Sequence, residues 1–291
     1  MEPHSDTVEG PARPAATVVM LRDGGAGLEV FLIRRHGLSD VLGGAYVFPG
    51  GKVDAQDAQP EMASRLDQPP RALHARLGEP GLEVLEAAGL YVAALREAFE
   101  ETGVLYADGA GQAEAAHANA LLREGRAFAE VLEALQLRLL AGRLMPWSRW
   151  VTPVSGGVLR KRFDARFFVA EVPPGQQASH DNHEATESVW LAPRAALRQY
   201  WDGAIELAPP QIMSLAHLSR HASVASVVAS AQARLPPLVQ PEAVEEDGVR
   251  VLCYPGDPRH SVHARALPGP TCLHYRNQRF EPPGGFEALF D

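Results

Sequence analysis

One short segment, "YVAALREAFEETGVLY" (Tyr91–Tyr106), constrains the fold of this chain more than any other. On a helix with 3.6 residues per turn, its apolar side chains gather on one face and its carboxylates on the opposite face. The carboxylates are Glu97, Glu100 and Glu101, at positions i, i+3 and i+4. Such like-charge neighbours cost about a few tenths of a kcal/mol per pair. The segment predicts a helix that packs one face on the core, concentrates negative charge on the other, and ends at Gly103.

Two interpretations of the acidic face are open. Charged runs on helices usually face water, so a solvated surface is one of them. The other is a cation site, because clustered carboxylates suit Mg²⁺ or Mn²⁺, hard ions whose coordination is commonly completed by substrate phosphates. The upstream loop "FPGG" supports the second interpretation, since Gly50 and Gly51 lack a Cβ and let the backbone pass close to a neighbouring group.

The first part of the chain has the pattern of a loose arm followed by a hairpin. Residues 1–14 are polar and rich in proline. Residues 16–35 contain two apolar, β-branched runs around a glycine-rich turn, which predicts paired strands. A short strand before Pro49 leads into the glycine loop. Further on, alternation in "KRFDARFFVAEV" predicts a strand with Phe163, Ala165, Phe167 and Val169 on one face.

Helices and a small β-rich tail account for most of the remainder. Helical patches occur between residues 58 and 84, and residues 112–142 have the spacing of one or two amphipathic helices. "ATESVWLAPRAAL" predicts a strand followed by a helix that starts at a proline. After about residue 240, short strand-like runs alternate with proline and glycine turns.

Composition narrows the class of partner and the compartment. The 291 residues carry a net charge of -9, which gives no reason to expect a nucleic-acid partner. Cys253 and Cys272 are too few for a disulfide framework, so a reducing compartment is expected. No segment has the pattern of a signal peptide or a membrane span. These observations predict a cytoplasmic protein that does not associate with membranes; they do not indicate its oligomeric state.

The motif "REAFEETGV" together with Gly50-Gly51 resembles the Nudix box, G-x5-E-x7-R-E-U-x-E-E-x-G-U, where U is a bulky apolar residue. Arg96 stands at the arginine position, and Ala98 stands where U is usual. The separation between Gly51 and Arg96 implies an insertion of about 31 residues in the box. Counting forward from Gly51 places Asp57 at the first acidic position, whereas counting backward from Arg96 places Ala88 there.

The inserted box is similar to that of the coenzyme A and acyl-CoA diphosphatase branch, as are "FPGGKVDAQD" and "WSRWVTP". The resemblance implies an α/β/α sandwich around a mixed β-sheet, with a helical insertion and a small C-terminal β-rich extension. It implies a Nudix domain over residues 15–205, an insertion at about 55–87, and a helical linker with the extension over 206–291. We expect the insertion to lie near the mouth of the site, so that deleting residues 58–84 would alter KM or specificity.

The resemblance also implies the chemistry. Nudix enzymes hydrolyse the pyrophosphate of a nucleoside diphosphate linked to another group, with water and a divalent metal. By carry-over, Glu100 and Glu101 are metal ligands, and Glu97 is a further ligand or the base that acts on water. Arg96 orients these glutamates. A later loop, "SHDNHEATESVW", supplies Glu184 as a second catalytic candidate, with Glu187 as the alternative and His180 and His183 nearby; solvated loop side chains are the other interpretation.

The substrate-binding candidates are four residues near the start of the box: Arg34, Arg35, Gly50 and Gly51. An arginine can contact a phosphate with two N–H groups, although charges that close a surface strand are the alternative. Trp147 and Trp150 could stack on a base or cover an edge of the core.

Three functions remain open. The favoured substrate is a coenzyme A compound, while ADP-ribose, a dinucleotide or a nucleotide sugar would require the same chemistry. A binding module without turnover is the third possibility, although such a module would be expected to lose the glutamates.

Overall fold

The structure is a computed structural model that describes residues 10–25, 27–37, 42–154, 161–181 and 185–291. Within these residues, no helix is both long and apolar enough to cross a membrane. Of the predicted N-terminal arm, residues 1–9 lie outside the described part. The first strand already begins at Arg13, so the described end of the arm belongs to the sheet.

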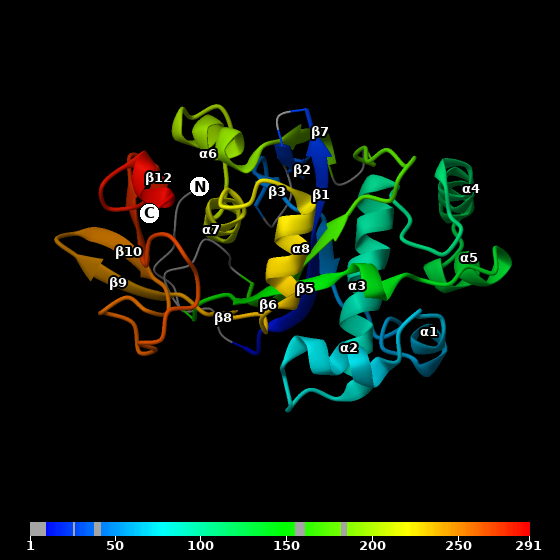
Figure 1. The fold of residues 1–291 in the computed structure, drawn as a ribbon. Helices are drawn as coiled ribbons and strands as arrows, with labels where there is room; N and C mark the ends of the chain where they lie inside the picture. The colour runs from blue at the N-terminus through cyan, green and yellow to red at the C-terminus, as the bar shows by residue number, and fades with distance from the viewer. Residues whose placement is uncertain (1–9, 26, 38–41, 155–160, 182–184) are drawn as a thin grey trace.

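A mixed sheet forms the centre of the molecule (Figure 1). Its strands are β1 (Arg13–Gly24), β2 (Gly27–Arg35), β3 (Tyr46–Val47), β4 (Gly50–Lys52), β5 (Met145–Val151), β6 (Phe163–Glu171), β7 (Ala185–Leu191) and β8 (Leu238–Val239). The order is β3-β2-β1-β6-β5-β8, with β4 paired to β1 and β7 paired to β2. β1 runs parallel to β6 and β5 parallel to β8, whereas the other pairs are antiparallel. The predicted hairpin is confirmed as β1 and β2.

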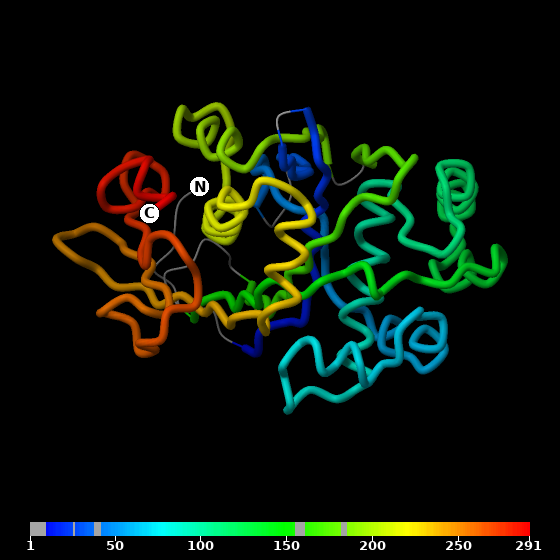
Figure 2. Tube along the Cα trace, in the orientation of Figure 1, coloured from blue at the N-terminus to red at the C-terminus, as the bar shows by residue number. Residues whose placement is uncertain are grey.

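Helices cover both faces of this sheet (Figure 2). The helices are α1 (Pro60–Ser64), α2 (Pro70–Leu77), α3 (Val84–Thr102), α4 (Gln112–Arg123), α5 (Phe128–Ala134), α6 (Pro193–Trp201), α7 (Pro209–Leu218) and α8 (Val224–Gln232). Buried residues of α1 to α5 pack on one face, and buried residues of α6 to α8 pack on the other. The predicted α/β/α sandwich with a mixed sheet is confirmed.

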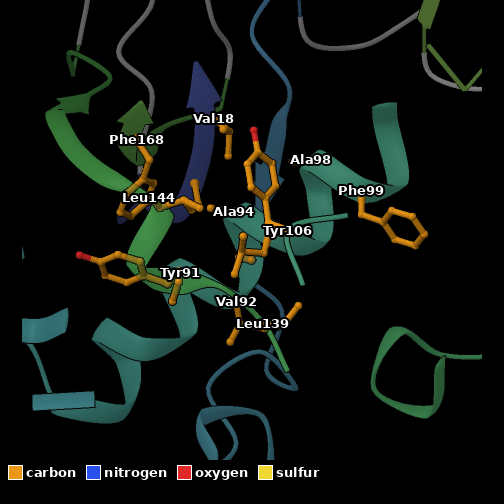
Figure 3. Close-up of a cluster of buried hydrophobic side chains, with 14 of the residues drawn as sticks. Val18, Tyr91, Val92, Ala94, Ala98, Phe99, Tyr106, Leu139, Leu144 and Phe168 are labelled. Atoms are coloured by element: carbon orange, nitrogen blue, oxygen red, sulfur yellow. The ribbon is translucent and has the colours of Figure 1, made fainter. Parts of the chain in front are cut away.

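Alternation along the central strands separates the two cores. In β1, Val18 faces α3, whereas Val19 belongs to the core on the opposite face. In β6, Phe168 lies against Tyr91 of α3, with ring centroids 4.7 Å apart (Figure 3). Its neighbour Phe167 belongs to the other core, as the predicted pattern of this strand required.

Helix α3 (Val84–Thr102) is the predicted acidic helix, extended by about two turns before Tyr91. Its first turn is stabilised by a capping box between Glu83 and Glu86. Its last turn ends at Gly103, whose φ of 70° is the left-handed conformation that glycine adopts without strain. Most of the intervening residues are buried, so α3 is the central helix of its layer.

The inserted segment packs on α3. Leu73 and Leu77 of α2 are buried against it, and the Tyr91 hydroxyl donates a hydrogen bond to the Leu73 carbonyl over 3.3 Å. At its end, Glu79 forms ion pairs with Arg149 of β5 at 2.7 Å and Arg166 of β6 at 2.5 Å. These contacts fix the insertion to both the helix and the sheet.

The C-terminal segment forms a second, antiparallel sheet in the order β12-β11-β10-β9. Its strands are β9 (Glu242–Glu246), β10 (Val249–Cys253), β11 (Cys272–Arg276) and β12 (Arg279–Glu281). This confirms the predicted β-rich extension. Figure 1 shows it on the side of the main sheet where α7 and α8 lie. Because α7 and α8 pack directly on that sheet, packing is continuous across the boundary predicted at residue 205.

Candidate active site

Arg96 is the hub of the acidic cluster. Its Nε and Nη2 donate to the two carboxylate oxygens of Asp57, each over 2.9 Å. Its Nη1 donates to Glu97 over 2.8 Å and to Glu100 over 3.0 Å. Nη2 also donates to the Lys52 carbonyl over 3.0 Å. One guanidinium therefore connects the box helix to the loop that follows β4.

This arrangement changes the proton affinities of the groups involved. Burial alone lowers the pKa of Arg96, but hydrogen bonding and attraction from Asp57, Glu97 and Glu100 outweigh it and raise the pKa above its ordinary value. Burial raises the pKa of Glu100, although Arg96 opposes this effect. Arg96 is thus a permanent cation held within a set of carboxylates.

Asp57 occupies the first acidic position of the box. Its side chain is 3% exposed, and besides Arg96 it accepts a hydrogen bond from the Asp54 N–H over 2.8 Å. Ala88, the alternative position, is fully buried in the apolar core and contributes no charge. These contacts favour the spacing counted forward from Gly51, with the insertion after Asp57.

Glu101 connects α3 to the glycine loop. The Gly50 N–H donates to Glu101 Oε2 over 2.7 Å, and Arg35 Nη1 lies 3.8 Å from Oε1. Glu101 is only 3% exposed. Gly50 has a φ of 153°, and a Cβ there would overlap the Ala16 carbonyl on the paired strand. Glycine is required at position 50 because β4 passes so close to β1.

Gly51 has a different role. A Cβ at this position would overlap the carboxylate of Glu97. Without it, the Glu97 carboxylate lies close against the backbone of β4, and Glu97 lines the cavity described next.

A cavity of about 430 Å³ opens beside the glycine loop. Its polar end is lined by Glu97, Arg35, Gly50, Gly51 and Lys52. The remainder is bounded by the pocket-facing side chains of β1, β5 and β6, by the start of α7, and by Pro241 and Leu252 of the C-terminal segment.

The predicted place of the insertion is wrong. No residue from 58 to 84 lines this cavity; the segment packs on α3 and on the sheet face opposite α7 and α8. The C-terminal segment lines the cavity instead. A shared insertion point within the box suggested proximity, but the apolar residues of α1 and α2 direct the segment to the core around α3.

The other predicted residues divide between the site and its surroundings. Arg35 lines the cavity, whereas Arg34 lies outside it, half exposed and 3.7 Å from Glu187 of β7. Trp150 lines the cavity, and Trp147 is a core residue stacked on His217 at 4.3 Å.

The later loop is only partly within the described residues. His180 Nδ1 lies 3.0 Å from Ser188 Oγ. Glu184 and His183 fall outside the described residues, so their predicted place remains a prediction.

The glutamates of α3 provide the donor type that a hard cation requires. All their donor atoms are carboxylate oxygens, and Glu97 lines the cavity that would hold a phosphate. Across the part of the chain that the structure describes, no group of three or more His, Cys, Asp or Glu residues converges closely enough to form a ready-made metal cluster. Instead, Glu97 and Glu100 contact Arg96, and Glu101 accepts from Gly50.

Sequence reasoning missed Thr17, Lys52 and Gln211, all of which line the cavity. Lys52 directly follows the glycine loop and could have been found from the motif. Gln211 belongs to the start of a largely buried helix, and no local signal marks it.

Comparisons with known proteins agree with the fold and with the box. Residues 12–218 match the family model described as the NUDT19 Nudix domain. Acyl-coenzyme A diphosphatase NUDT19 of Gallus gallus is 29% identical over 237 residues, covering 67% of this chain and 62% of that protein. The Xenopus laevis protein of the same name is 26% identical over 231 residues, covering 67% and 61%. The chain thus spans less than two thirds of the length of these relatives.

A solved structure shares the fold. The crystal structure of a NUDIX hydrolase from Alicyclobacillus acidocaldarius superposes with a TM-score of 0.60 at 28% identity, covering 78% of this chain and 97% of that one. The fold, the geometry of the box and the match to the family model all indicate the same family. Because the family model covers well over half of the 291 residues, this chain belongs to the Nudix hydrolase family, in the group described by the NUDT19 Nudix domain.

Proposed function

We propose that this protein hydrolyses the pyrophosphate bond of a nucleoside diphosphate linked to another group, with coenzyme A or acyl-CoA as the favoured substrate. The observation that carries the proposal is the placement of Glu97 and the Gly50-Gly51 loop at the polar end of a cavity of about 430 Å³. Relatives described as acyl-coenzyme A diphosphatases support the choice of substrate.

The glutamates Glu97, Glu100 and Glu101 would hold Mg²⁺ or Mn²⁺, which, when bound, neutralises pyrophosphate charge and lowers the pKa of water. Arg35 and Lys52 line the same end of the cavity and add positive charge where the pyrophosphate would lie. In an overall acidic protein, this local charge gives the pyrophosphate a defined position and orientation.

Glu97 is the proposed base. Its carboxylate lines the cavity and would accept the proton of the attacking water at one of its oxygens. Arg96 acts as a positioning residue, because its Nη1 contacts both Glu97 and Glu100 and restricts their rotamers. The hydrogen bond from Gly50 N–H holds Glu101 in the same way.

Glu184 is a second proposed catalytic group, on sequence grounds alone. If Glu184→Gln leaves the rate within about twofold of the original protein, this assignment is removed.

The test is a substrate screen with purified protein. Coenzyme A, acetyl-CoA, ADP-ribose, NADH and UDP-glucose are incubated with Mg²⁺ or Mn²⁺, and the products are separated by chromatography. Glu101→Gln should lower kcat by at least about 100-fold. Glu124→Gln, at an exposed residue just beyond α4, is the matched control and should leave kcat unchanged.

Preferential cleavage of the coenzyme A compounds, lost in Glu101→Gln, would support the proposal. Cleavage of ADP-ribose, NADH or UDP-glucose alone would keep the chemistry and reject the favoured substrate. No hydrolysis of any of the five compounds would reject the favoured substrates and leave an untested substrate or a binding module as the alternatives.

A further inference from the structure

The cavity continues beyond its polar end into a mainly apolar compartment; Arg13, Thr152 and Lys161 also line the cavity. Two rows of paired residues cross the sheet here. In the first, Trp150 of β5 is paired with Ala165 of β6, which is paired with Ala15 of β1, which is paired with Lys52 of β4. All four line the cavity. The two alanines leave space that larger side chains would fill, and Trp150 borders that space.

Two aromatic residues of β6 also line this part of the cavity. Phe163 and Phe167, two residues to either side of Ala165, face the same way and also line the cavity. In the second row, Phe167 is paired with Thr17, which is paired with Gly50 at the polar end. The aromatic compartment is therefore one strand away from the glycine loop.

The opposite wall is formed by residues that follow the Nudix box in the chain. It consists of the first residues of α7, together with Pro241 and Leu252. Pro241 and Leu252 lie outside residues 12–218, the part matched by the family model. The C-terminal segment thus supplies part of the surface that a bound molecule would contact.

Gln211 is a polar exception in this wall. Its side chain is 5% exposed, and its Oε1 has no hydrogen-bond partner among the described residues. The cavity-lining residues Pro209, Pro210 and Pro241 have no N–H to offer it. A buried carboxamide oxygen without a donor is energetically unfavourable.

We propose that Gln211 determines specificity for the non-phosphate part of the substrate, and that its Oε1 accepts a hydrogen bond from an N–H group of that part. The inference rests on the proposed function, because it takes this cavity to be the substrate site. The ligand chemistry is an N–H donor attached to an apolar or aromatic body. Both a chain amide and the exocyclic amine of a purine have it, and coenzyme A contains both.

The experiment measures binding separately from turnover. Dissociation constants are determined by calorimetry, without added metal, for coenzyme A, for ADP-ribose, which has the purine amine but no chain amide, and for a coenzyme A analogue with hypoxanthine in place of adenine. Gln211→Met removes the acceptor at similar volume, and Gln211→Glu retains acceptor oxygens. Thermal unfolding of each variant is measured in the absence of ligand.

Gln211→Met should weaken coenzyme A binding by about 10- to 100-fold, corresponding to the cost of an unpaired donor. Gln211→Glu should bind more tightly than Gln211→Met. A matching loss for ADP-ribose but not for the hypoxanthine analogue identifies the purine amine as the donor. A loss for the analogue but not for ADP-ribose identifies a chain amide. The melting temperature of Gln211→Met should not fall, because an unpaired polar group has been removed.

Equal affinities of the original protein and Gln211→Met for all three ligands would overturn the proposal. Equal losses of ligand affinity and thermal stability in both variants would also overturn it, by showing a structural role. If the original protein binds coenzyme A in a Gln211-dependent manner but cleaves nothing, the Gln211 proposal stands and the proposed hydrolysis fails.

Discussion

At the scale of single residues, Arg96 organises the site because one guanidinium contacts three carboxylates at once. Asp57 holds it with two hydrogen bonds on the side away from α3, and Glu97 and Glu100 hold it along the helix. Side-chain exposure is 3% for Asp57 and 11% for Arg96, so this pair is largely removed from solvent. Removing one partner of a buried pair costs far more than removing a surface charge.

Asp57→Ala should therefore lower the free energy of unfolding by about 3 kcal/mol, measured by urea denaturation. It should also lower kcat, since Arg96 would no longer fix Glu97. Asp54→Ala is the matched control: this carboxylate is 61% exposed and 3.6 Å from Arg96. The control should cost less than about 1 kcal/mol. Equal losses in the two variants would contradict the role given to Asp57.

Gly51→Ala tests the close packing of the Glu97 carboxylate on β4. The new methyl group would overlap the Glu97 carboxylate and displace it. Because a shift of about 1 Å can reduce a rate by about 100-fold, kcat should fall strongly while the fold persists. Gly81→Ala, where a Cβ meets nothing within 4 Å, is the control. A kcat for Gly51→Ala within twofold of the original would show that the position of Glu97 does not matter.

At the scale of elements, α2 contributes to stability rather than to the cavity. Leu73 is fully buried between α2 and α3. Leu73→Ala should lower the free energy of unfolding by about 2–5 kcal/mol, as truncation of a buried leucine does. KM and substrate preference should not change. Exposed Arg71 on the same helix provides the control, because Arg71→Ala should leave both stability and kinetics nearly unchanged. A change in substrate preference for Leu73→Ala would return the insertion to the mouth of the site.

Helix α3 shows how much a local pattern can predict. Its two faces, its glutamates and its end at Gly103 follow from residue spacing and glycine conformation alone. Its start at Val84 does not, because the residues before Tyr91 include Gly89 and show no clear two-faced pattern; Ala87, Ala88 and Leu90 are buried in the core around α3.

At the scale of the whole molecule, residues of α7 share one core with the main sheet and the C-terminal segment. His217 of α7 is buried against Trp147, and Arg234 lies over the same ring at 4.6 Å from its centroid. Burial, followed by repulsion from Arg234, His221 and Arg220, lowers the pKa of His217 to about 3. The folded protein therefore keeps this imidazole neutral, while the unfolded chain protonates it below its ordinary pKa of about 6.5.

The sign of the resulting pH dependence follows from proton uptake. Below pH 6.5, the unfolded state binds one proton that the folded state excludes, so His217 should reduce stability as the pH falls toward 3. The slope should approach about 1.4 kcal/mol per pH unit. Urea denaturation between pH 7 and 5 measures it, and His217→Gln should flatten the curve in that range. An unchanged slope in the variant would contradict the assignment.

Sequence by itself determined the elements whose causes are local. Hairpin, acidic helix, alternating strand and β-rich tail follow from periodicity and turn residues, and the family resemblance supplied the sandwich. It also named the site residues of the box, Glu97, Glu100, Glu101, Arg96 and the two glycines. Tertiary structure decided which distant residues meet them. Asp57 rather than Ala88 faces Arg96, Arg35 rather than Arg34 reaches the cavity, and the C-terminal segment rather than the insertion lines it. These contacts depend on strand register and on which apolar faces become buried. Both are determined by packing between residues that are distant in the sequence, which local spacing does not encode.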